Sequence, residues 1–333
     1  CLAWPVSYSS ALSLRFLFFH LTCMLCVVVT VSAVERTEQL LRLAGMASLA
    51  MAGTGLYAVY QRIQGVEVNY SYVDALLNEG MPGRVYAVFD NPNAFAQVLV
   101  LLIPLGVALL LGSRTGWGRL GALIALGLGA LAIGMTYARA SWIGLVAAAA
   151  VFVFLWNRRL IPAFLLLGLL ALPLLPDTIF NRILTIFNLK DTSTSSRFPL
   201  YEAALRLIRV SGAGLGTAAL QDYIRDFNLY HGEAPFVHAH DIYLQVWLET
   251  GLLGIASFVA ALLAGIKAAA KSVKMPGCPA PVRMVTIGGA ASMAGILVCG
   301  IADYIWNYPR VMVVFWFVFA VMLSGVKLAK KSK

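Results

Sequence analysis

The sequence Pro235-Phe-Val-His238-Ala-His240-Asp241-Ile-Tyr-Leu-Gln-Val-Trp-Leu-Glu249-Thr-Gly251-Leu-Leu-Gly254 passes without a break from a polar loop into an apolar helix. Its two histidines are therefore expected where water meets the bilayer. Ionisable groups at that boundary are costly to keep and by default mark a functional site. The stretch predicts a membrane-embedded protein whose active end lies at the start of this helix.

Composition supports a membrane protein. The chain has 333 residues, of which 60% are hydrophobic and only 12% charged, and its mean hydropathy is +0.82. Soluble domains have roughly 45–50% apolar and about 25% charged residues. The net charge of +10 is explained by basic residues that face the cytoplasm, without invoking nucleic acid. The five cysteines form no array typical of disulfide frameworks or zinc sites.

Apolar runs predict an all-α integral membrane domain over residues 1–333 with about nine spans. A span needs about 20 apolar residues. The last run before the long polar loop is short and is equally compatible with a half-span. The predicted spans are Ala11–Ala33, Leu40–Tyr60, Ala94–Gly112, Leu120–Thr136, Ser141–Trp156, Leu160–Leu175, Ile242–Ile266, Val285–Asp303 and Val311–Val326.

Basic residues predict the orientation of these spans. The short connections on one side carry 14 Lys and Arg, and those on the other side carry four. The richer side is expected to face the cytoplasm, together with the C-terminus. An odd number of spans then leaves Cys1 outside, which predicts that upstream sequence is missing.

One long polar segment, 176–241, is expected on the outer side. Within it, Pro199–Val210 has apolar residues at helical spacing and predicts an amphipathic helix. A second short helix is predicted at Gln221–Leu229. We expect this segment to lie on the bilayer surface as a lid over the site and not to form a separate domain.

His238 and His240 favour a general-base function, because imidazole accepts a proton near neutral pH. A position at the bilayer edge limits water and suits transfer to a hydroxyl other than water. Two alternatives stay open: interfacial histidines that satisfy backbone groups, and a metal site. The further ligands available nearby would be Asp241, His231 and Glu233.

Two arginines are candidates for phosphate binding. Arg139 lies in a very short outer connection, Thr136-Tyr-Ala-Arg-Ala-Ser-Trp142, and Arg197 precedes the predicted loop helix. A guanidinium group matches phosphate oxygens bidentately. The alternatives are an interface anchor for Arg139 and a solvated loop charge for Arg197.

Three further features have structural explanations beside functional ones. Asn91 and Asn93 belong to an Asp-Asn-Pro-Asn turn that is typical of a helix start. The glycines at 212, 214 and 216 resemble a phosphate loop, but the strand that such a loop requires does not precede them. A tight turn with positive φ is the better interpretation. Glu249 and Asp303 are the acids expected at membrane depth, and Glu249 is expected to pair with arginine or to be protonated.

In order along the chain, these segments resemble the O-antigen ligase/polymerase superfamily of bacterial membrane proteins. The resemblance covers roughly Val85 to the C-terminus. It rests on Phe89-Asp-Asn-Pro-Asn-Ala-Phe-Ala96, Arg139 between two spans, Arg197 before a helix, Gly212-Ala-Gly-Leu-Gly216, and His240-Asp-Ile-Tyr-Leu-Gln followed by Glu249-Thr-Gly-Leu-Leu-Gly254. Ala138 and Ala140 stand where the family usually has Ser and often Gly, and Asp241 stands in place of its usual Asn.

The resemblance implies a C-type glycosyltransferase-like fold, an undecaprenyl-pyrophosphate-linked glycan donor, and inverting chemistry without a metal or cofactor. It implies catalytic roles for Arg139, Arg197 and His240 at the outer face of the cytoplasmic (inner) membrane. We also expect a second set of residues to contact the substrates, with one of them, His238, as the substitute base. These are His238, Asp241, Asn91, Asn93 and Glu249.

The predicted function is transfer of the glycan to an acceptor hydroxyl. The acceptor stays open among a lipid-A core sugar, a growing polysaccharide, a wall polymer and a protein side chain. The leading alternative is a transporter or flippase of lipid-linked sugars that uses the same arginines as an anion path. It is disfavoured because the sequence has no paired half that repeats the break at 136–142. A third alternative is an inactive membrane scaffold.

Overall fold

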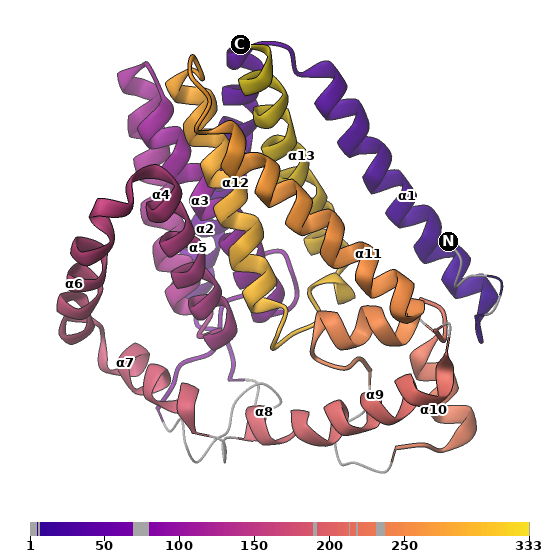
Figure 1. Cartoon of the computed structure of the whole chain (residues 1–333). Coiled ribbons are helices and arrows are strands. Elements are labelled where there is room, and N and C mark those ends of the chain that lie inside the picture. Colours follow the sequence, from indigo (N-terminus) through magenta and orange to yellow (C-terminus); the bar gives the residue numbers. More distant parts are fainter. Residues whose placement is uncertain are drawn as a thin grey trace.

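The computed structural model describes residues 5, 7–68, 80–188, 192–212, 214–217, 219–230 and 237–332, and these residues form helices joined by loops and turns (Figure 1). The α-helices are α1 (Ser10–Ala33), α2 (Thr37–Gln64), α3 (Pro92–Gly112), α4 (Gly116–Met135), α5 (Arg139–Asn157), α6 (Ile161–Ala171), α7 (Asp177–Leu184), α8 (Thr192–Ser195), α9 (Arg197–Ser211), α10 (Leu220–Phe227), α11 (Ile242–Ser272), α12 (Ala280–Cys299) and α13 (Pro309–Lys331).

Among the described residues, eight helical runs are long and apolar enough to span a membrane. The prediction of a polytopic helical membrane protein is therefore confirmed, with eight such runs among the described residues where about nine spans were predicted. The predicted span Leu160–Leu175 is the tail of one continuous run, Arg139–Leu174. Its α-helix α6 has 11 residues, about 17 Å at 1.5 Å per residue, which is too short for a hydrocarbon core of about 30 Å.

Two helices form the centre of the bundle. In α12, 78% of the most apolar window is buried, and in α3 the value is 72%. The centre packs closely because small residues face each other: a Cβ added to Gly295 of α12 would lie 2.7 Å from the carbonyl oxygen of Gly144 in α5. This approach brings the start of α5 beside the end of α12, where Cys299 Sγ donates to the carbonyl oxygen of Ala140 at 3.4 Å.

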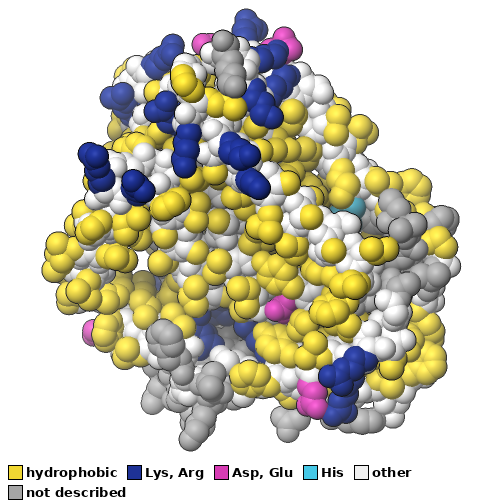
Figure 2. All heavy atoms as spheres, viewed as in Figure 1, with side chains coloured by type: hydrophobic (Ala, Val, Ile, Leu, Met, Phe, Trp, Pro, Cys, Tyr) yellow, Lys and Arg dark blue, Asp and Glu magenta, His cyan; other side chains and the backbone are white. Residues whose placement is uncertain are grey.

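The two ends of the bundle differ in charge. Figure 2 shows Lys and Arg side chains gathered at the end that holds the C-terminus in Figure 1. The segment from α7 to α10 crosses the opposite end (Figure 1). The predicted loop helices Pro199–Val210 and Gln221–Leu229 are confirmed as α9 and α10. The long polar segment therefore lies opposite the end where the Lys and Arg side chains of the short connections gather, as the charge pattern predicted.

Candidate active site

Two histidines and one aspartate meet at the end that the α7–α10 segment crosses. The imidazole centroids of His238 and His240 are 4.1 Å apart, and Nδ1 of His240 lies 3.6 Å from Oδ1 of Asp303. The backbone N–H of His240 donates to Nδ1 of His238 at 3.1 Å. His240 has a φ of +49°, which is uncommon for a residue with a side chain and turns the chain sharply between the loop and α11.

Asp303 is held in place from two elements. Its Oδ2 accepts a hydrogen bond from Nε2 of Gln97 in α3 at 2.9 Å, and its Oδ1 accepts one from the backbone N–H of Tyr304 at 2.9 Å. Burial raises the pKa of this carboxyl, but the adjacent His240 and the charges of both histidines and Arg197 together lower it to about 2. An ionised carboxylate therefore faces His240.

The loop that carries the histidines is fixed by the first turns of α11. Asp241 is the N-cap, and its Oδ1 accepts from the backbone N–H groups of Tyr243 and Leu244. Gln245 accepts from the backbone N–H of Ala239 at 2.8 Å and donates to Oε1 of Glu249 at 2.9 Å. Asp241 therefore stabilises the turn between the histidines and α11, and its carboxylate is used to cap that helix.

His238 is buried and has an unusually low pKa. Burial, the positive charge of His240 and that of Arg197 lower the pKa of its imidazole to about 4, against an opposing effect of Asp303. His238 is therefore neutral across the physiological pH range.

The depressed pKa of His238 predicts acid sensitivity. Between pH 6.5 and about 4 the unfolded chain binds a proton that the folded protein excludes, so stability falls as the pH falls through this window. The expected slope is at most about 1.4 kcal/mol per pH unit. The measurement is the thermal midpoint in detergent at pH 7 and pH 5. His238→Asn should show a shallower pH dependence than the wild type, and equal slopes would contradict the assignment.

The glycine-rich turn binds the backbone groups that are left free where α11 is interrupted. Gly251 has φ +68° and ψ −174°, which interrupts the helix. The freed carbonyl oxygens of Leu248 and Glu249 accept from the backbone N–H groups of Leu215 and Gly216, both at 2.9 Å. Gly214 and Gly216 have φ values of +103° and +88°. The interpretation as a tight turn is confirmed, because its N–H groups bind protein carbonyls.

Substitution of this turn has a large predicted effect on folding. A Cβ at Gly214 would lie 2.5 Å from the carbonyl oxygen of Glu249, so Gly214→Ala is expected to destabilise the protein by about 2–5 kcal/mol through backbone strain and overpacking. Gly212→Ala is the matched control, because Gly212 also has positive φ but a Cβ there meets nothing within 4 Å. Equal losses of thermal stability in detergent would contradict this packing argument.

Arg139 begins α5 and contacts the outer segment. Its Nη1 donates to the carbonyl oxygen and to Oγ1 of Thr185, at 2.8 and 3.1 Å, and its Nη2 donates to Oγ1 of Thr194 at 3.3 Å. Thr194 is three residues before Arg197. The guanidinium of Arg139 therefore docks onto the part of the chain that presents the second arginine.

Arg197 begins α9 and acts electrostatically on His238 and Asp303. Its positive charge helps to lower the pKa of both His238 and Asp303. One turn later, the hydroxyl of Tyr201 donates to the carbonyl oxygen of His240 at 3.4 Å. The structure thus brings His238, His240 and Asp303 together, with the charge of Arg197 acting on His238 and Asp303, and Arg139 contacts Thr194, three residues before Arg197.

The asparagines occupy structural positions beside this site. Asn91 caps α3 by accepting from the backbone N–H groups of Asn93 and Ala94. Oδ1 of Asn93 accepts from Nη2 of Arg84 at 2.5 Å, and Nε of Arg84 donates to the carbonyl oxygen of Thr136 at 2.6 Å. This chain of contacts ties α3 to the connection that carries Arg139. Direct contact of the two asparagines with substrate stays a prediction.

Sequence reasoning noted Asp303 only as an acid at membrane depth, and did not assign it to the site. Such an acid is itself a signal of function. Asp303 also gives the metal-site alternative a different set of possible ligands. Ligand atoms of His238, His240 and Asp303 all lie within 4.8 Å of one another. Asp241 is used as a cap, and His231 and Glu233 lie outside the described residues.

Fold and site together define a polytopic helical membrane protein with a cluster of histidine, aspartate and arginine at one end of its bundle. The family model described as O-Antigen ligase matches residues 124–259. This match confirms the resemblance to the O-antigen ligase superfamily, and the matched range contains Arg139, Arg197, His238 and His240. No curated protein matches the chain.

Proposed function

We propose that this protein transfers a glycan from undecaprenyl pyrophosphate to an acceptor hydroxyl, at the outer face of a bacterial cytoplasmic membrane. The observation that carries the proposal is the cluster of His238, His240 and Asp303, with the charge of Arg197 acting on it, at the end opposite the one where Lys and Arg gather. The family match supports ligase-type chemistry in general. The donor, the direction of the reaction and the residue roles belong to the proposal.

In the proposed reaction, the acceptor oxygen attacks the anomeric carbon from the face opposite the pyrophosphate. The bond from that carbon to the pyrophosphate oxygen breaks, and the configuration inverts. The acceptor proton passes to His240, whose imidazolium is stabilised by the carboxylate of Asp303, 3.6 Å away. The leaving pyrophosphate gains negative charge, which Arg139 and Arg197 stabilise.

The α7–α10 segment would cover the reacting groups. It presents Arg197 at the start of α9 and contacts Arg139 through Thr185 and Thr194. A cover over the site limits water, which would otherwise compete with the acceptor as nucleophile. His238 is neutral because of its low pKa, and its Nδ1 already accepts from the backbone N–H of His240, so its Nε2 is suited to donate a hydrogen bond to a substrate oxygen.

One assay with purified protein distinguishes a transfer enzyme from a transporter. Purified protein in detergent micelles is mixed with undecaprenyl-pyrophosphate-linked oligosaccharide, which here can serve as both donor and acceptor, and with EDTA. We expect a lengthened glycan and free undecaprenyl pyrophosphate, because the reaction needs neither a second compartment nor a metal. Loss of product with EDTA would favour the metal alternative at His238, His240 and Asp303. Movement of the substrate across liposomes without product would favour a transporter.

A further inference from the structure

Gln97 is a polar side chain in the apolar centre of the bundle. It lies in the second turn of α3 between the buried Ala96 and Val98, and only 1% of it is exposed. Its Nε2 donates to Oδ2 of Asp303 at 2.9 Å, while its Oε1 is buried and makes no hydrogen bond. A buried acceptor without a partner is destabilising. The amide is therefore explained by its contact with Asp303 and not by the stability of the bundle.

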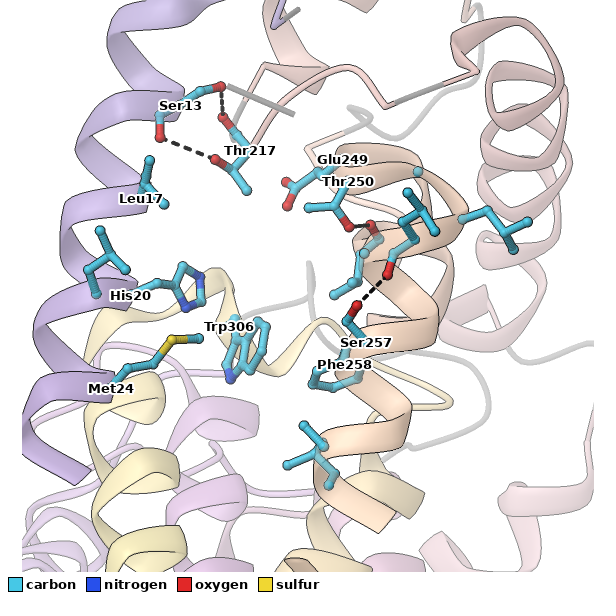
Figure 3. Close-up of a pocket in the computed structure, with 18 of the residues that line it drawn as sticks. Ser13, Leu17, His20, Met24, Thr217, Glu249, Thr250, Ser257, Phe258 and Trp306 are labelled. Carbon is cyan, nitrogen blue, oxygen red and sulfur yellow. Dashed lines mark hydrogen bonds between the residues drawn. The ribbon is translucent and has the colours of Figure 1, made fainter. Parts of the chain in front are cut away.

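Two buried carboxylates lie close to the histidine loop, and their surroundings differ. Glu249 of α11 accepts from Nε2 of Gln245 at 2.9 Å, and it lines a cavity of about 710 Å³ between α1, α11 and α13 (Figure 3). Asp303 is not among the residues that line this cavity. Its Oδ1 instead lies 3.6 Å from Nδ1 of His240. Asp303 is therefore the carboxylate that can orient the imidazole of His240.

The two nitrogens of His240 have different surroundings. Its Nδ1 is buried and makes no hydrogen bond, although 34% of the side chain is exposed. The exposed part of the ring therefore excludes Nδ1, and Nε2 is the nitrogen left to meet a substrate. Hydrogen bonds of catalytic groups are often long without substrate and shorten when it binds, so the 3.6 Å separation from Asp303 is one that can close. An ionised carboxylate only accepts and thus favours a proton on Nδ1.

The carboxylate of Asp303 is held in one orientation by two donors. The backbone N–H of Tyr304 binds Oδ1 at 2.9 Å, and Gln97 binds Oδ2 at 2.9 Å. The first contact is local, because Tyr304 follows Asp303 in the chain. The second comes from another helix and fixes which oxygen faces His240. Without it, the carboxylate is free to rotate about its Cβ–Cγ bond and to turn away from Nδ1.

We propose that Gln97 is a positioning residue for the transfer reaction: it holds Asp303 so that His240 carries its proton on Nδ1 and offers the lone pair of Nε2 to the acceptor hydroxyl. This inference rests on the proposed function and specifies which nitrogen acts as the base. In that step the O–H bond of the acceptor breaks, an N–H bond forms at Nε2, and Asp303 stabilises the resulting imidazolium. A ring with its proton on Nε2 has no lone pair there. Because Gln97 is buried, it acts through Asp303 and does not contact substrate.

The test observes the tautomer directly and needs no turnover. Protein with isotope-labelled histidine in lipid nanodiscs is studied by nitrogen NMR at about pH 8.5, where an ordinary imidazole is neutral. The His240→Asn variant identifies the signals of His240 by their absence. We expect the wild type to carry the proton on Nδ1. Gln97→Met keeps an unbranched, flexible side chain but cannot donate, and it should move the proton to Nε2 in part or all of the population. Gln97→Asn, whose amide is one methylene shorter, is the second variant and should do the same.

Ser292 provides a matched control at the same contact between helices. It is buried in α12, and its Oγ donates to the carbonyl oxygen of Leu101 in α3 at 2.7 Å. Ser292→Ala removes this bond but leaves the contact between Gln97 and Asp303, so it should keep the tautomer and the kcat of the wild type. Gln97→Met should lower kcat by about 10–100-fold, the effect found for groups that orient metal-bound histidines, and leave the donor KM unchanged. In the Asp303→Asn background it should cause no further loss.

Three outcomes would overturn the inference. A wild-type proton on Nε2 of His240 would mean that Asp303 does not set the tautomer. An unchanged tautomer in both Gln97 variants would leave Gln97 with a packing role only. The same change in Ser292→Ala would attribute it to general loosening of α3 against α12. The expected tautomers without any transfer by the wild type would instead count against the proposed reaction and support the positioning of His240 through Gln97.

Discussion

His240→Ala is expected to lower the turnover of glycan transfer by about 10²–10⁴-fold, the range over which a positioned general base contributes. The reason is geometric: the imidazole faces the ionised Asp303 at 3.6 Å, and the sharp turn at φ +49° fixes its direction. Alanine removes the only group in the proposed reaction that accepts the hydroxyl proton. The measurement is turnover of purified protein in detergent at saturating donor, with abundance and thermal midpoint determined in parallel.

Asp303→Asn distinguishes a positioning role from a merely structural one. Its oxygen still accepts from Gln97, but the negative charge beside His240 is lost. If Asp303 acts through His240, then the double variant with His240→Ala should be no slower than His240→Ala alone, because residues that act as a unit are not additive. Additive losses would assign Asp303 to structure alone, and wild-type turnover by His240→Ala would reject the general base.

Loss of either arginine has the second largest expected effect. Arg139→Ala and Arg197→Ala should each reduce kcat/KM by about 10²–10³-fold, as when one donor to a developing charge is removed. Lysine at the same positions should restore part of the activity, because it keeps the charge but not the bidentate geometry. Both variants should also bind undecaprenyl pyrophosphate more weakly, since that product carries the charge that the guanidinium groups hold.

A control for these variants lies on the same helix as Arg197. Arg209 is exposed near the end of α9, and Arg209→Ala should change activity by less than about twofold, as a surface substitution away from the site. A loss similar to that of Arg197→Ala would attribute the effect to general surface charge. Normal transfer by both Arg139→Ala and Arg197→Ala, at normal abundance, would reject the proposed pyrophosphate site.

Most of the fold was predictable because a bilayer imposes a length on apolar segments. Eight of the predicted spans fall on separate long apolar helices, and an amphipathic period located α9. The exception, α6, shows the limit of this reasoning. Its composition is apolar enough for a span, but the polar Asn157-Arg-Arg159 sequence and a prolyl residue at 162 end α5 and start a short new helix.

The site was predictable in part. His238, His240, Arg139 and Arg197 carry local signals, because charged groups beside apolar runs need a reason to be there. Asp303 lies 63 residues after His240, and its orientation depends on Gln97, 206 residues before it. Such contacts are set by the packing of α3 against α12, which no local pattern encodes. The cavity near Glu249 also depends on tertiary arrangement.

The break at Gly251 has a mechanical consequence for the histidines. Before the break, the backbone N–H of Ile242 donates to Gly300 at 2.8 Å, and the carbonyl oxygens of Leu248 and Glu249 are bound by the glycine-rich turn. The 21 residues that follow, Leu252–Ser272, form the long arm of α11. We expect bending of this arm with bilayer thickness to be absorbed by rotation at this glycine. The short anchored piece would then keep its position, and with it the two histidines that directly precede α11.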